Sequence, residues 1–103
     1  MIAIQVARII ARFVVFADLT EADLLDPDTS VEMMEVLGAQ LEALEKAFLR
    51  ELVDAFVVVA EEYGGEAQQE VRDIAHSFYL EEALAADDPA RLAELEASRD
   101  ERD

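Results

Sequence analysis

The sequence contains no cysteine, no tryptophan, only three glycines and two prolines, and a single histidine, His76. Without cysteine the chain offers no disulfide and no thiolate ligand, and one imidazole is too few for a typical zinc site. The Gly-x-Ser-x-Gly pattern of serine hydrolases and a glycine-rich phosphate-binding loop are also missing. The three serines at 30, 77 and 98 are expected at helix caps or on the surface. We therefore expect no enzyme, no cofactor and no bound metal.

Positive charge is also scarce. Eight Lys and Arg residues stand against 25 Asp and Glu residues, which gives a formal net charge of -17. Residues 1–17 hold Arg8 and Arg12 and no acid, so all of the negative charge falls on the rest of the chain. Such a surface repels nucleic acid and anionic lipid and attracts basic surfaces. We expect a basic protein partner, and neither nucleic acid nor membrane.

Long hydrophobic runs are missing as well. The first 17 residues are apolar and end in Val15-Phe16-Ala17, which resembles the cleavage site of a secretory signal. In such a signal the basic residues precede the apolar segment, whereas Arg8 and Arg12 lie inside it. No stretch approaches the roughly 20 apolar residues of a membrane-spanning helix. We expect a cytoplasmic location.

The residues that are abundant, Ala, Leu and Glu, favour helix. The spacing of apolar residues predicts helices over 2–19, 30–63, 66–86 and 89–98. Three local signals set their ends: the capping pair Thr29 and Glu32, the helix-ending pair Gly64-Gly65, and the helix start at Asp88-Pro89. Within the second of these, Gly38 is read as a tolerated helix glycine. We predict an all-α bundle of three main helices plus a short C-terminal helix. It forms a single domain over residues 1–98, followed by a frayed or disordered tail over 99–103.

A short motif occurs twice, as FVVFAD at 13–18 and as FVVVAE at 56–61. Neither copy alternates apolar and polar residues, so both are expected in buried helices that pack on each other rather than in strands. The sequence leaves open whether the repeated motif arose by duplication or by coincidence of similar packing requirements.

The first helix is apolar around most of its circumference, with large side chains at Ile2, Ile9, Phe13 and Phe16. Such a helix is either central in the core or shared with a second subunit. These four residues are therefore core residues of a monomeric bundle, the seam of a two-fold homodimer or a contact with a different protein, and the sequence leaves these alternatives open.

Five carboxylates lie within eleven residues, at the end of the first predicted helix and in the segment that leads to the second. They are Asp18, Glu21, Asp23, Asp26 and Asp28. Leu24-Leu25 and Pro27 replace the alternating acids and central glycine of a calcium loop, so calcium is not expected. Acids at helix starts interact favourably with the helix dipole, which is the structural explanation. The functional one is a partner-binding acidic face, to which we add Glu61 and Glu62 as candidates.

The surroundings of His76 are the one place where metal chemistry needs weighing. Asp73 lies three residues earlier, and an antiparallel hairpin at the two glycines would bring Asp54 near His76. A complete di-metal carboxylate site would need a second chain, because each chain has one histidine. We instead expect Asp54 or Asp73 to pair with His76 or Arg72.

Over residues 7–50, a first helix leads through the acidic turn Leu-Asp-Pro-Asp at 25–28 into a second helix. This arrangement resembles the short, acidic, all-helical immunity and antitoxin proteins of bacterial toxin systems. The resemblance implies a stoichiometric toxin inhibitor that blocks the toxin's active site and has no catalytic residues of its own. The alternative is a helical homodimeric structural or regulatory adaptor.

Overall fold

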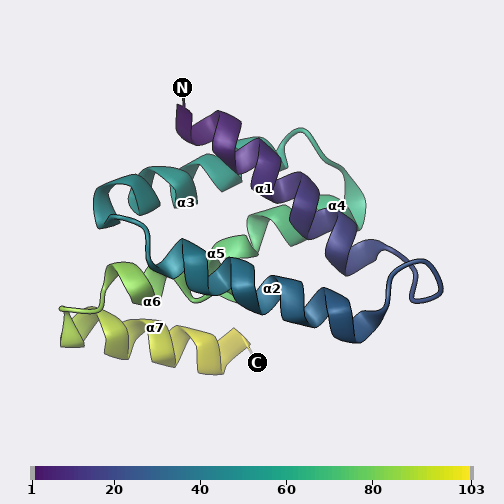
Figure 1. Ribbon diagram of the computed structural model, residues 1–103. Coiled ribbons are helices and arrows are strands. Elements are labelled where there is room, and N and C mark those ends of the chain that lie inside the picture. Colours follow the sequence, from purple (N-terminus) through teal and green to yellow (C-terminus); the bar gives the residue numbers. More distant parts are fainter. Residues whose placement is uncertain (1, 103) are drawn as a thin grey trace.

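The structure, a computed structural model, describes residues 2–102 (Figure 1). Within this range the chain forms seven helices and no strand, which confirms the all-α class. The helices are α1 (Ile2–Leu19), α2 (Pro27–Glu42), α3 (Lys46–Ala60), α4 (Gly65–Arg72), α5 (Ile74–Ser77), α6 (Leu80–Leu84) and α7 (Pro89–Arg102).

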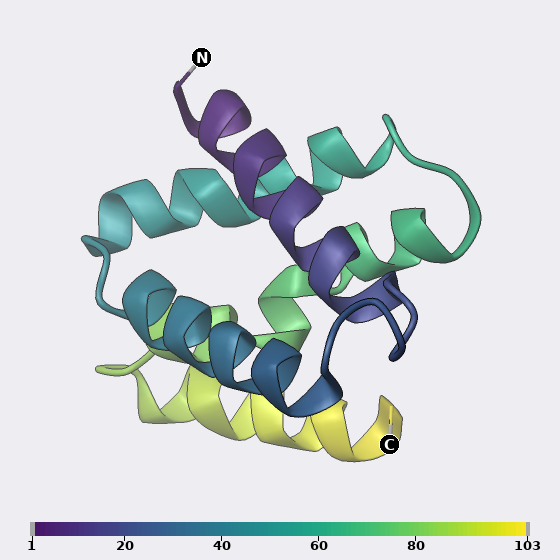
Figure 2. The same cartoon turned by 45° about the vertical axis from the view of Figure 1, so that its right-hand side comes forward.

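The helices form two layers. Helix α1 crosses α3 and α4 in one layer, α2, α6 and α7 make up the other, and α5 connects them (Figures 1 and 2). The most extensive contact joins α1 to α3, the two helices that carry the repeated motif. Both copies of the motif are therefore helical, as expected, and the helices that hold them pack on each other.

The α1–α3 contact pairs a stripe of small side chains with a stripe of large ones. The buried face of α1 consists of Ala3, Ala7, Ala11, Val14 and Ala17. Opposite it, α3 buries Leu49, Leu52, Phe56 and Val59, each no more than 1% exposed. Burial of one such large side chain contributes about 1.5–3 kcal/mol. The alanine stripe lets the α1 backbone approach closely, so α3 supplies most of the core volume.

The predicted helix over 30–63 is wrong, because the structure has two helices there, α2 and α3, joined at residues 43–45. One continuous helix of that length would extend about 50 Å, whereas the longest dimension of the molecule is 43 Å. The break turns α3 beneath α1, so that Leu41 of α2 and Leu49 of α3 join the same core. No Gly or Pro marks the break, and Glu45 becomes the N-cap of α3.

The predicted helix over 66–86 is also wrong, because it is divided into α4, α5 and α6. Tyr79, between α5 and α6, has a φ of 57°, which lies in the left-handed region. This conformation costs a residue with a Cβ about 1–2 kcal/mol, so surrounding contacts must hold it. The glycine pair does not end the preceding helix as predicted, because α3 ends at Ala60 with Glu61 as a right-handed C-cap, and Gly65, with a φ of 58°, is the first residue of α4.

Helix α7 continues through Arg102, so residues 99–102 are helical instead of a frayed tail, and Asp103 lies outside the described residues. The helix buries no residue fully. Three arginines hold it, because Arg91, Arg99 and Arg102 form ion pairs with Glu81, Glu82 and Asp73 at 3.6, 3.0 and 3.2 Å. Ion pairing to α6 and to Asp73, the residue between α4 and α5, thus explains why the helix does not end at Ser98.

The start of α2 differs from the predicted capping box. The helix begins at Pro27 with Asp26 as N-cap, and the Thr29 hydroxyl donates to the Asp26 carboxylate at 2.9 Å. Ser30, expected as a cap or surface residue, is buried and donates to the Ala17 carbonyl at 2.7 Å. This hydrogen bond ties the start of α2 to the end of α1 across the acidic loop.

Candidate functional site

Helix α2 has a groove along each of its two flanks. The groove between α1 and α2, here the apolar groove, has a volume of about 610 Å³ and is lined by Ile9, Ile10, Phe13, Thr29, Glu32, Met33, Val36, Leu37 and Gln40. The groove between α2 and the α5–α6 segment, here the acidic groove, has a volume of about 490 Å³. It is lined by Asp18, Ser30, Val31, Met34, Glu35, Gly38, Ala39, Glu42, Ser77, Phe78 and Tyr79.

Close contact between Gly38 and Phe78 brings the two sides of the acidic groove together. A Cβ at position 38 would lie 2.9 Å from Cδ1 of Phe78. Only glycine at this point of α2 lets the aromatic ring rest against the helix backbone. Gly38, which the sequence presents as a tolerated helix glycine, is therefore a packing requirement of this groove.

Tyr79 forms part of the other wall and is held by Arg99 of α7. The Arg99 guanidinium lies 3.8 Å from the centroid of the Tyr79 ring, a cation–π contact. It also donates to the His76 carbonyl at 2.9 Å and to the Glu82 carboxylate at 3.0 Å. One arginine thus holds the strained tyrosine, the end of α5 and the start of α6 in place.

The predicted partners of His76 are wrong. Its Nε2 lies 3.1 Å from Nη1 of Arg99, and since a guanidinium only donates, this nitrogen takes the acceptor role in the contact. Asp54 instead pairs with Arg50 at 2.8 Å, and Asp73 pairs with Arg102. Within residues 2–102, no three His, Asp or Glu side chains are grouped so that they could hold a metal ion.

Charge is distributed very unevenly around these grooves. Residues 13–45 contain nine acids and no Lys or Arg. No ion pair within residues 2–102 involves any of the nine, whereas seven of the eight Lys and Arg side chains, all but Arg12, are in ion pairs. The bases of this protein therefore pair only with acids outside residues 13–45, and the carboxylates of the α1–α2 loop and α2 have no ion-pair partner within the described residues.

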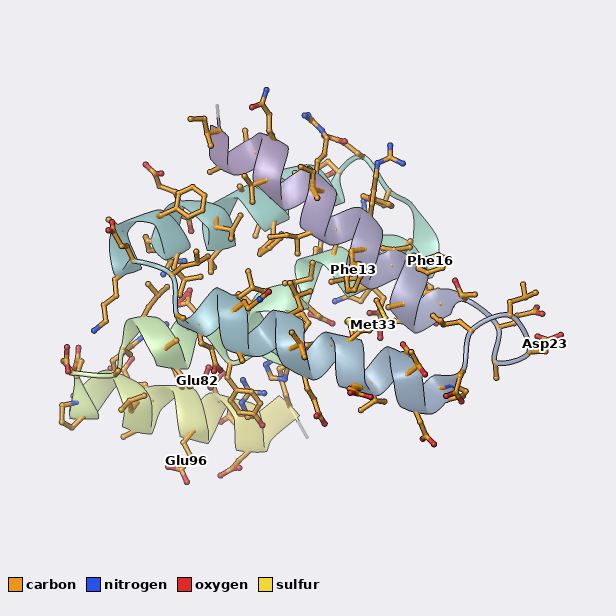
Figure 3. The ribbon with its side chains drawn as sticks, viewed as in Figure 1. Phe13, Phe16, Asp23, Met33, Glu82 and Glu96 are labelled. Atoms are coloured by element: carbon orange, nitrogen blue, oxygen red, sulfur yellow. The ribbon has the colours of Figure 1, made fainter. Side chains whose placement is uncertain are left out.

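Seven of these carboxylates line the acidic groove or lie on the loop and helix start beside it. We call them the acidic surface: Asp18, Glu21, Asp23, Asp26, Asp28, Glu35 and Glu42. Figure 3 shows Asp23 at the tip of the loop, directed away from the rest of the chain. The five acids predicted from the sequence, which lie on the α1–α2 loop and the helix ends beside it, are accompanied by two that were missed, Glu35 and Glu42. The signal that could have found these two is the absence of any base from 13–45.

The other two predicted acids, Glu61 and Glu62, are already neutralised. Glu61 pairs with Arg72 at 2.8 Å and Glu62 with Arg8 at 2.9 Å. The hydrogen bond and the charge of Arg8 hold the pKa of Glu62 below its ordinary value. The structure therefore separates this pair electrostatically from the acidic surface.

Asp18 joins the acidic surface to a further carboxyl group on α4, Glu70. Partial burial, together with a hydrogen bond to Asp18 and the negative charges of Asp18, Glu66 and Asp73, raises the pKa of Glu70 to about 7. Near neutral pH this glutamate therefore carries a proton for part of the time, which relieves repulsion between α1 and α4.

The four apolar residues of the proposed seam are not in the core. Ile2, Ile9 and Phe16 are 70%, 69% and 56% exposed, and Phe13 is half-buried. Figure 3 shows Phe13 of α1 and Met33 of α2 facing each other across the apolar groove. The core alternative for these residues is wrong, because the alanine stripe of α1 occupies the inward face, and the homodimer seam stays a prediction.

Comparisons with known proteins found no matching family model, no matching curated protein and no matching solved structure. Among helices α1 to α7, none is both long enough and apolar enough to traverse a bilayer.

Proposed function

We propose that this protein is a non-catalytic inhibitor of the bacterial immunity type, which binds and neutralises a basic toxin through its acidic surface in the cytoplasm. The observation that carries the proposal is the set of nine acids in residues 13–45, none of them in an ion pair within the described chain. Carboxylates that no Lys or Arg of the same chain pairs with remain available to the cations of a partner.

The acidic groove adds an apolar anchor to this charge. Val31 and Tyr79 are 57% and 50% exposed, and both line the groove between Glu35, Glu42 and Asp18. Interfaces gain most of their affinity from a few desolvated apolar or aromatic contacts, while surrounding charges speed association and select the partner. A partner side chain with an apolar stem and a cationic end, such as arginine, fits this combination.

A toxin-like protein encoded beside this chain is the first partner to test. Replacing Asp23, Asp26 and Asp28 together by Asn should weaken its binding at least about tenfold, which corresponds to about 1.4 kcal/mol. The loss should be mainly in the association rate and should shrink as salt is added, because the contacts are electrostatic. Surface plasmon resonance at low and high salt measures both, and co-expression measures protection from the toxin.

The matched control removes the same charge elsewhere. Glu96, Asp100 and Glu101 lie on exposed positions of α7 and take part in no ion pair within the described residues, and Glu96 points away from the molecule in Figure 3. Neutralising these three should leave the affinity within about twofold of wild type. Equal losses in both variants, or no loss in the loop variant, would contradict the proposal.

A further inference from the structure

The outward face of α1 carries a seam with the spacing of a coiled coil. Its residues, separated by four, three, four and three, are Ile2, Val6, Ile9, Phe13 and Phe16. Apolar residues at this spacing pack against a second helix. The side of α1 that meets α3 is the alanine stripe, so the seam is a second apolar face on the same helix, and three of its five members are more than half exposed.

Helix α2 extends this apolar face across the groove. Met33 and Val36 are 38% and 55% exposed and line the apolar groove together with Ile9 and Phe13. A continuous apolar surface made of two adjacent helices is a typical site of association. The question is which partner covers it.

Charge at the two rims favours a second copy of this chain. Arg8 and Arg12 lie on the α1 rim, next to Ile9, and Arg12 has no ion pair within residues 2–102. Glu32 lies on the α2 rim. A two-fold axis along the groove would place the α1 rim of each copy over the α2 rim of the other. The arginines of each copy would then face Glu32 of the other copy, once at each rim. A basic partner would instead meet like charge along α1.

We propose that the protein forms a two-fold homodimer in which α1 of each copy lies over α2 of the other, with the apolar groove closed between them. In this arrangement base faces acid at both rims, so the interface itself avoids the like-charge repulsion that a net charge of -17 creates between two copies. The acidic groove lies on the opposite flank of α2 and stays open to another partner. The dimer is independent of the inhibitor function, and either can fail without the other.

Sedimentation velocity of the full chain over a series of concentrations tests the dimer. The wild-type protein should sediment as a dimer at micromolar concentration. Replacing Val36 or Ile9 by Ser should raise the dimer dissociation constant at least about tenfold, because each removes an apolar contact from the seam. Circular dichroism of the same samples shows that the variants remain folded.

Val57 provides the matched control, because it is an apolar side chain on α3, outside the apolar groove, with 56% exposure against 55% for Val36. Val57→Ser should leave the dissociation constant unchanged. A wild-type protein that remains monomeric at all concentrations would overturn the dimer, and so would an equal effect of Val57→Ser and Val36→Ser.

The rim charges give a second test of the two-fold arrangement. Arg12→Glu alone should weaken the dimer, because it places acid against acid at both rims. Combining it with Glu32→Arg should restore at least part of the affinity, since the charges are then exchanged and not removed. A double variant as weak as Arg12→Glu alone would overturn this arrangement of the two chains.

Discussion

The two grooves along α2 differ in how their second wall is held, although they share one helix. In the apolar groove that wall is α1, held against α3 by close packing of alanines on large side chains. In the acidic groove it is the α5–α6 segment, held by the contacts of Arg99 with Tyr79, His76 and Glu82. One wall depends on apolar packing and the other on charge, so changes of sequence and of solvent should affect them differently.

The wall held by charge is the easier one to disrupt. Arg99→Ala removes its hydrogen bonds and the cation–π contact at a side chain that is only 17% exposed. It also leaves the Glu82 carboxylate and the His76 carbonyl without this donor. We expect a loss of about 2–3 kcal/mol in the free energy of unfolding, measured by urea denaturation. Faster hydrogen exchange over 89–102 would show that α7 is released.

Arg91→Ala is the control for this effect. Arg91 also joins α7 to Glu81, but its side chain is 45% exposed and the distance is 3.6 Å, so its loss should cost below about 1 kcal/mol. Equal losses for the two arginines would mean that the network around Arg99 adds nothing beyond an ordinary surface ion pair.

Ser30 links α1 to α2, the helix that the two grooves share, and its replacement should lower the free energy of unfolding less than Arg99→Ala does. Ser30→Ala leaves the buried Ala17 carbonyl without its hydrogen bond and should cost about 1–1.5 kcal/mol. Because this bond ties the start of α2 to the end of α1, the variant should weaken dimer formation as well as partner binding. The measurements are urea denaturation and sedimentation.

Thr29→Ala removes the neighbouring hydroxyl, which is exposed and bonds only to Asp26, and should cost less than about 0.5 kcal/mol. A Ser30 variant no less stable than this control would show that the Ala17 carbonyl is satisfied in another way.

The smallest expected effect is a pH dependence of stability that comes from Glu70, which lies beside Asp18 of the acidic surface. The pKa of Glu70 is raised from an ordinary value of 4.5 to about 7 in the folded protein. The folded state therefore binds this proton more tightly than the unfolded state, and the resulting stability is present below pH 4.5 and is lost as pH rises to about 7. Glu70→Gln should remove this dependence and raise the melting temperature at pH 8.

Glu96→Gln removes the same formal charge from the outer face of α7 and should leave the slope of stability against pH between 4.5 and 7 as in the wild type. The opposite trend below this range belongs to Glu62, whose pKa is lowered by Arg8 and whose stabilising contribution is lost as pH falls. A Glu70 variant with an unchanged slope would contradict the role given to this carboxyl group.

The all-α class could be predicted from the sequence, but the way in which the helices break and pack could be predicted only in part. The helical state and the start at Pro89 follow from local composition and turn chemistry. The breaks at residues 43–45 and at Tyr79 could not be predicted, because neither contains Gly or Pro and both depend on contacts with distant residues. The same applies to Arg99, whose role depends on α7 lying against α5 and α6.

The sequence by itself determined the helical class and the concentration of negative charge on residues 13–45, because composition and the order of charges do not depend on packing. Only the tertiary structure decided which face of α1 is buried. The hydrophobic effect alone would turn its isoleucines and phenylalanines inward. Close crossing over α3 requires small side chains at the contact, so the alanines take that position and the large residues form the outward seam. That choice separates the two grooves of α2 into an apolar one and an acidic one.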